Sequence, residues 1–185
     1  MNTFFLIVSL IPLIAVNVWH NVLLSEPTAG HKPRSISEHA ASSPHLLLRH
    51  RIAHTVGSIF LSIYGLFYLL PHGHSVAASL LIGAAIFDVI EVVTLNKKSA
   101  SEITALNYHV VTAWAMALCY LLYASVAVTI AGLSSLFVFM IWISFAALLI
   151  TAVLRKFKDF WITQHIYFCF LALIMAIGQI ALSVR

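Results

Sequence analysis

The sequence predicts an all-α protein, a polytopic integral membrane protein with six transmembrane helices in one bundle, and a single domain over residues 1–185. Two observations support this prediction. Hydrophobic residues make up 62% of the chain and charged residues 9%, whereas soluble domains carry roughly 25% charged residues. The hydrophobic residues also gather into six segments, each near the roughly 20 residues that a helix needs to cross a bilayer. The lipid bilayer is therefore the first expected partner.

The six segments are expected to be helices because lipid offers no hydrogen-bond partners to a backbone, so each segment must satisfy its own N–H and C=O groups. The first segment has no positive side chain before it and no small-residue cleavage site after it. We therefore expect a retained helix rather than a secretory signal. The predicted spans are residues 3–24, 52–71, 75–95, 105–131, 135–154 and 160–184.

The lysines and arginines predict the orientation of the bundle. Nine of the ten lie in or beside the polar loop 25–51, the loop after the third span and the loop after the fifth span, and only Arg185 lies at the other side. Positive side chains favour the cytoplasmic side, so we predict an N-out/C-out protein of the cell membrane (the inner membrane in a bacterium) with loop 25–51 in the cytoplasm. The basic residues that give the net charge of +4 thus lie at the membrane edges, so no nucleic acid partner is expected.

Two acidic side chains, Asp88 and Glu91, interrupt the third span. A carboxylate in the membrane interior costs a few kcal/mol on insertion scales. The spacing of three residues places both side chains on one helix face, which must therefore point into the bundle. We take Asp88 and Glu91 as the candidate catalytic residues.

Histidines from four other spans lie in the same layer as the two acids. At a rise of 1.5 Å per residue, each lies within about 10 Å of the cytoplasmic edge. Imidazole and carboxylate groups together bind zinc, iron or manganese, and two histidines on facing helices can bind a b-type haem. The predicted metal ligands are His54, Asp88, Glu91, His109 and His165, with His20 and His50 as additional candidates.

His50 and His54 form the one local motif, RHRIAH, whose spacing of four residues puts both imidazoles on one helix face. The motif resembles the first histidine box of the membrane fatty-acid desaturases. That family also has HxxHH-type boxes, and this sequence has none. The sequence therefore assigns the chain to no family.

Three classes of function agree with these patterns. The favoured one is a metal- or haem-dependent redox or hydrolytic step on a lipid-like or small-molecule ligand that enters from the cytoplasmic side. An alternative is a proton- or cation-coupled transporter or channel, because buried acids and histidines are common parts of proton relays. The few polar residues in the outer halves of the spans favour a one-sided site instead. A third class is an accessory subunit of a membrane complex, or a homo-oligomer, whose acids pair with basic side chains of a partner.

Overall fold

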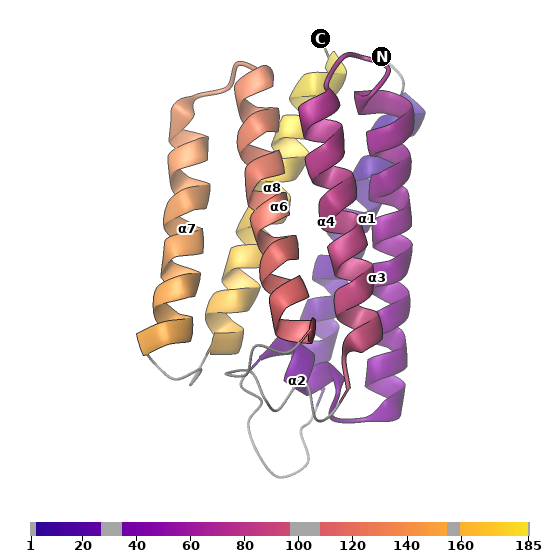
Figure 1. Ribbon diagram of the computed structural model, residues 1–185, viewed down its shortest axis with the longest axis vertical. Helices are drawn as coiled ribbons and strands as arrows, with labels where there is room; N and C mark the ends of the chain where they lie inside the picture. The colour runs from indigo at the N-terminus through magenta and orange to yellow at the C-terminus, as the bar shows by residue number, and fades with distance from the viewer. Residues whose placement is uncertain (1–2, 27–34, 97–107, 155–159, 185) are drawn as a thin grey trace.

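The computed structural model describes residues 3–26, 35–96, 108–154 and 160–184. All regular structure within these ranges is helical, and six helices are long and apolar enough to cross a membrane. The predicted all-α, multi-pass fold is therefore confirmed. Figure 1 shows the long helices side by side, with both termini at one end of the bundle and the short helix α2 at the other. We call these the terminal end and the α2 end.

The helices in chain order include one short helix and one π-helical segment between the long ones. α3 begins at Pro44, inside the segment predicted as loop 25–51, because the Ser43 hydroxyl accepts a hydrogen bond from the Leu46 N–H and Pro44 suits the first helical turn. The π-helix η1 continues α3, so the two form one span. The elements are α1 (Thr3–Ser25), α2 (Ile36–Ala40), α3 (Pro44–Tyr64), η1 (Gly65–Leu69), α4 (Ser75–Thr94), α6 (Tyr108–Ile130), α7 (Ser135–Leu154) and α8 (Phe160–Val184).

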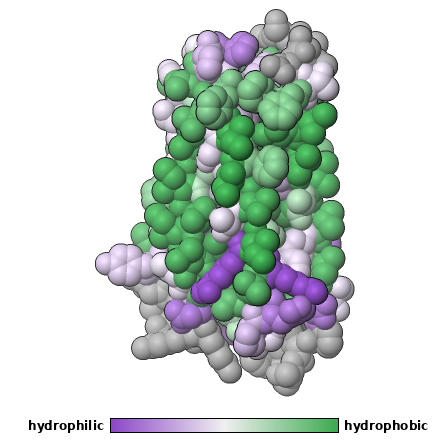
Figure 2. All heavy atoms as spheres, turned by 90° about the vertical axis from the view of Figure 1, so that its right-hand side faces the viewer, coloured by the Kyte–Doolittle hydropathy of each residue, from purple (hydrophilic) through white to green (hydrophobic). Residues whose placement is uncertain are grey.

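The long helices pack with α4 between α3 and α6, and with α8 against α1, α6 and α7. Alanines such as Ala77 and Ala84 are fully buried where α4 meets its neighbours. Their small side chains allow the helices to approach closely. At Gly57 on α3, an added Cβ would lie 3.2 Å from the Val16 side chain of α1, so this contact also requires a small residue. Figure 2 shows a largely hydrophobic surface along the bundle, with hydrophilic side chains gathered toward the α2 end.

Arg51 fastens α3 to the end of α4. Its Nε donates a hydrogen bond to the Val92 carbonyl at 2.9 Å, and its Nη2 donates to the Leu95 carbonyl at 2.8 Å. The last carbonyls of a helix have no partner within the helix, so these bonds stabilise the C-terminus of α4. Both helices are therefore fixed to each other at the α2 end, next to the acids of α4.

The orientation of the bundle stays a prediction, and most of the basic residues behind it lie outside the described residues. A reporter fused after Arg185 tests it in a bacterial host. With the C-terminus outside, we expect an active alkaline phosphatase fusion and a dark green-fluorescent-protein fusion at this position. Fusions that end the chain after Asn96 should give the opposite pair of signals. A fluorescent fusion at Arg185 would contradict the N-out/C-out orientation.

Candidate metal centre

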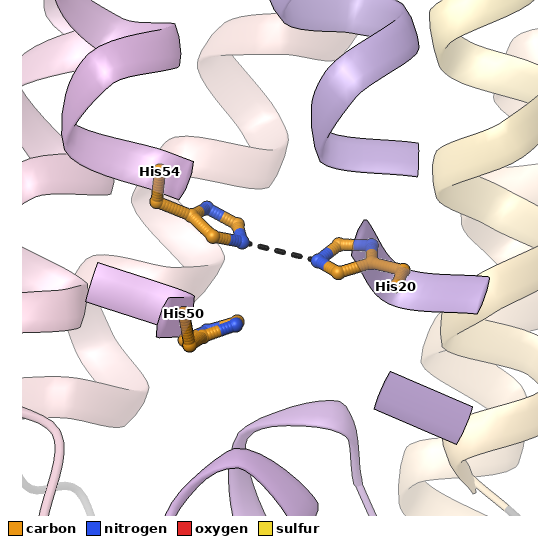
Figure 3. Close-up of side chains that lie close together, drawn as sticks. All are labelled: His20, His50 and His54. Atoms are coloured by element: carbon orange, nitrogen blue, oxygen red, sulfur yellow. Dashed lines mark hydrogen bonds between the residues drawn. The ribbon is translucent and has the colours of Figure 1, made fainter. Parts of the chain in front are cut away.

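Three buried histidines from two helices meet near the α2 end of the bundle. His50 and His54 lie on one face of α3 with their ring centroids 4.3 Å apart, and His20 approaches from α1. Figure 3 shows the ring of His20 facing that of His54, with the His50 ring next to His54 on α3. One ring nitrogen of each histidine lies within 4.8 Å of the others, and each residue is at most 7% exposed. These three side chains, the histidine triad, can hold a metal ion.

The closest contact within the triad joins Nε2 of His20 to Nε2 of His54 at 3.0 Å (Figure 3). Two nitrogens bound to one tetrahedral zinc ion at 2.0–2.1 Å are separated by roughly 3.3 Å. The observed spacing is close to that value, so an ion can replace the shared proton with little movement of either helix.

Asp88 lies against the second ring nitrogen of His54. Its Oδ1 accepts a hydrogen bond from His54 Nδ1 at 2.8 Å, and its Oδ2 accepts one from the Ser58 hydroxyl at 2.8 Å. Because Nδ1 of His54 donates to the carboxylate, Nε2 is left with its lone pair directed at His20. A carboxylate in this position fixes the tautomer of a metal-binding histidine and raises its basicity. The structure therefore places Asp88 behind a candidate ligand, where it orients the ring.

Trp19 contacts the third histidine. Its indole Nε1 donates a hydrogen bond to Nδ1 of His50 at 3.1 Å. An indole N–H can only donate, so neutral His50 carries its proton on Nε2. A metal ion bound through either nitrogen of His50 requires this bond to open, because Nδ1 must then bind the ion or carry the proton. His20 and His54 are consequently the stronger pair of ligands, and Trp19 competes with the ion for His50.

A cavity of about 70 Å³ adjoins the triad. Its polar wall combines the three histidines with Glu91, His109 and the first residues of α2, and its apolar wall comes from α6, α7 and α8. This volume holds an ion with a few water molecules. A porphyrin does not fit, because cofactor-sized ligands occupy pockets of roughly 300–1,000 Å³. The arrangement therefore suits a metal ion and not the b-type haem.

Glu91 lies on α4 and lines the same cavity. Its Oε1 accepts a hydrogen bond from the Ser37 hydroxyl at 3.1 Å and lies 3.2 Å from Nδ1 of His109. Its Oε2 is buried and has no hydrogen-bond partner among the described residues. The carboxylate is thus held by one oxygen, while the other is free to accept a proton. Glu91 and His109 form a pair beside the triad and do not belong to its group of three nitrogens.

Two predicted ligands, Asp88 and His165, do not line this cavity. Asp88 contacts His54 from the other side of its ring, and His165 lies on α8. Its side chain is half-buried and its Nε2 lies 3.6 Å from the Cys169 sulfur on the same helix. The neighbouring Gln164 lines the cavity instead, and its Oε1 accepts a hydrogen bond from the Ile36 N–H at 3.0 Å. Depth along the helix brought His165 into the predicted set. It interacts electrostatically with His20, but it does not belong to the group of three nitrogens.

The short helix α2 covers the cavity at the α2 end of the bundle. The Ser35 hydroxyl accepts a hydrogen bond from the Glu38 N–H and begins the helix, and Ser35, Ile36 and Ser37 line the cavity. Ile36 is buried with Leu23 of α1 in a small hydrophobic cluster. The sequence did not indicate Trp19 or Ser37 as parts of the site. Trp19 precedes His20 directly, whereas Ser37 has no local signal because its contact to Glu91 spans 54 residues.

Comparison of the chain with protein-family models, curated proteins and solved structures finds no match. The description of its class therefore comes from the fold and the site alone. The chain is a multi-pass membrane protein with a buried histidine triad that can bind a metal ion.

The docking of α2 is expected to weaken in acid. Burial lowers the pKa of His39 on α2, because the charged imidazolium would lose its hydration, and the nearby backbone carbonyl and carboxylate of Glu26 offset only part of this. When α2 is undocked, His39 has the ordinary histidine pKa of about 6.5 and so binds a proton more readily than in the docked helix. Docking is therefore complete above that pH and is lost as the pH falls toward the lowered pKa.

Hydrogen exchange of residues 35–41 at pH 8 and pH 5.5 measures this change. Exchange should be faster at pH 5.5, after correction for the intrinsic rate, in the wild-type chain. His39→Gln removes the titrating ring, so its exchange should differ little between the two conditions. Equal protection of the wild-type segment at both pH values would contradict the assignment to His39.

Proposed function

We propose that the chain binds one divalent metal ion, preferably zinc, at His20, His50 and His54, and uses it to hydrolyse a lipid-like substrate. The observation behind this proposal is the histidine triad, three buried imidazoles with nitrogens within 4.8 Å of one another. Three neutral nitrogen ligands with an open fourth position are typical of catalytic zinc. Iron and manganese sites more often add a carboxylate, and both oxygens of Asp88 are already engaged.

Glu91 is the general base of the proposed reaction. A bound zinc ion would lower the pKa of a coordinated water molecule toward neutrality and would polarise a substrate carbonyl. The free Oε2 of Glu91 would take one proton from that water as its oxygen attacks the carbonyl carbon, and would return the proton to the departing alcohol. His109 and Ser37 contact the other carboxylate oxygen, so Oε2 has no partner among the described residues.

The walls of the cavity support an amphiphilic substrate. Trp114, Met116 and Phe168 line it opposite the polar groups, and the cavity lies within a helical bundle that is surrounded by lipid. Access through α2 would admit a polar headgroup, while the apolar wall accepts the adjoining hydrocarbon. Because α2 belongs to the loop with the basic residues, we place this entrance on the cytoplasmic side.

Metal analysis of the purified full-length chain tests the binding site. After incubation with zinc and removal of the excess, we expect about one zinc ion per chain. His20→Ala and His54→Ala should lose the ion, because each removes one of the closest pair of ligands. Asp88→Asn should keep the site but bind zinc roughly 10–100-fold more weakly, as found when an orienting carboxylate is removed.

His165→Ala is the matched control, because it removes a histidine of the same layer that lies outside the triad, and it should retain full zinc content. Trp19→Phe should bind zinc more tightly than the wild type, since it removes the donor that competes for His50. Full zinc content in both His20→Ala and His54→Ala would refute a site at the triad.

Hydrolysis of p-nitrophenyl acyl esters in detergent micelles tests the chemistry separately from binding. Glu91→Gln should retain zinc but lose at least about 100-fold in kcat, the usual effect of removing a general base. Glu38→Gln changes an acid of α2 that does not line the cavity and should leave the rate unchanged. Equal rates in the wild type and Glu91→Gln would show that Glu91 is not the base, whatever the zinc content.

A further inference from the structure

A second set of buried polar side chains lies in the half of the bundle nearer to the terminal end. It comes from α3, η1, α6 and α8 and differs from the metal centre in having no acid and no histidine. Three of its members are completely buried. The set, which we call the tyrosine cluster, comprises Tyr64, Tyr68, Tyr123, Gln179 and Ser183.

The tyrosine cluster contains polar atoms that the protein itself does not satisfy. The hydroxyls of Tyr64 and Tyr123 and both amide atoms of Gln179 are buried without a hydrogen bond of standard geometry to the described residues. These groups nevertheless lie near one another, since Tyr123 interacts with Gln179, and Tyr64 with Tyr123 and Ser183. Buried polar groups without partners are costly, and ordered water is their usual partner. The geometry therefore indicates water within the cluster.

A second cavity, of about 60 Å³, lies between the metal centre and the tyrosine cluster. His20, His54 and Asp88 line it together with Tyr120 and Asn17, whose Oδ1 is buried and also has no partner among the described residues. A cavity needs only about 10–15 Å³ and two to four polar partners to hold a water molecule. The second cavity meets both conditions.

The tyrosine cluster begins one helical turn beyond this cavity on each of three helices. Residues three or four apart in a helix lie on the same face, one above the other. Three lining residues of the cavity are followed in this way by cluster residues: Tyr120 by Tyr123, Leu61 by Tyr64, and Met175 by Gln179. The cavity and the cluster therefore lie in successive turns of the same three helices, and we call the two together the polar column.

The column reaches the surface at the terminal end. Tyr64 stacks on Tyr68 with a centroid distance of 5.1 Å, and Tyr68 stacks on His72 at 4.4 Å. Tyr68 donates a hydrogen bond to the Leu182 carbonyl at 3.3 Å, which ties η1 to α8. His72 lies exposed in the turn after η1. At the other end, the second cavity shares His20 and His54 with the first cavity, which extends toward α2.

We propose that this polar column conducts protons between the two ends of the bundle. Hydroxyl, amide and water groups both donate and accept hydrogen bonds, so a proton can pass along them without a charged carrier crossing the apolar core. A metal cation cannot be passed from group to group in this way, because it moves as a whole ion and needs a set of oxygen ligands in place of its hydration shell. The proposal depends on the polar groups of the terminal half and stands whether or not the triad holds a metal ion.

Proton flux into proteoliposomes of the purified full-length chain tests the proposal. A potassium gradient with valinomycin sets the potential, and a trapped pH dye reports the flux. Tyr123→Phe and Gln179→Leu remove polar atoms from the column while nearly preserving volume. Each should lower the flux at least about tenfold, because a broken hydrogen-bonded link raises the barrier to transfer. Tyr108→Phe removes the same hydroxyl from a residue that is 83% exposed and should keep the wild-type flux.

Three results overturn the proposal: wild-type flux no greater than that of protein-free liposomes, wild-type flux retained by both Tyr123→Phe and Gln179→Leu, or sodium flux as fast as proton flux. Ser183→Ala serves as the deciding variant where one of the two does not yield a monodisperse protein. Zinc content is measured on the same samples. Loss of proton flux with full zinc content in Tyr123→Phe or Gln179→Leu supports the column independently of the metal site.

Discussion

The hydrogen bond between Asp88 and His54 is the interaction on which the arrangement of the site depends. Lipid cannot hydrate a carboxylate, so Asp88 must find its partners within the bundle, and it finds them in His54 and Ser58 of α3. This contact fixes the imidazole of His54 and directs its other nitrogen at His20 of α1. One chain of hydrogen bonds thus joins three helices, and it leaves a pair of nitrogens spaced for a shared ion. The acid that looked misplaced in a hydrophobic segment is what aligns the neighbouring helices.

The sequence predicts the fold class because hydropathy alone defines helices that must satisfy their own backbones. It also predicts the layer of His20, His54, Asp88 and Glu91, because the rise per residue converts position into depth. Depth does not give direction around the helix axis or the identity of the neighbouring helix. For that reason His165 entered the predicted set at the right height but is not one of the three histidines whose nitrogens meet. The contribution of α2 could not be predicted from the sequence, because no periodic pattern indicates that Ser37 contacts Glu91.

The same limit explains why the terminal half of the bundle looked almost purely apolar in sequence. Its polar residues are few, and counting them suggested a site open to one side only. In the structure, Tyr64, Tyr123 and Gln179 come from three different helices and converge in one place. The effect of a polar residue in a membrane span depends on whether other polar residues contact it. A few such residues can form a cluster when all of them face the centre of the bundle. Composition therefore does not show which polar residues meet in the folded bundle.

The π-helix at Gly65–Leu69 makes the directions of the side chains sensitive to the deletion of a residue. A π-helical turn holds more residues than an α-helical one, so it rotates the residues that follow relative to those before. Before it, α3 presents His50 and His54 to α1, and within it the Tyr68 hydroxyl reaches α8. Deleting one residue here would restore regular α-helix and turn Tyr68 by roughly 100° about the axis. The directions of the side chains along this helix therefore depend on the number of residues in the π-helical turn. A substitution within the turn would preserve these directions, whereas a deletion would change them.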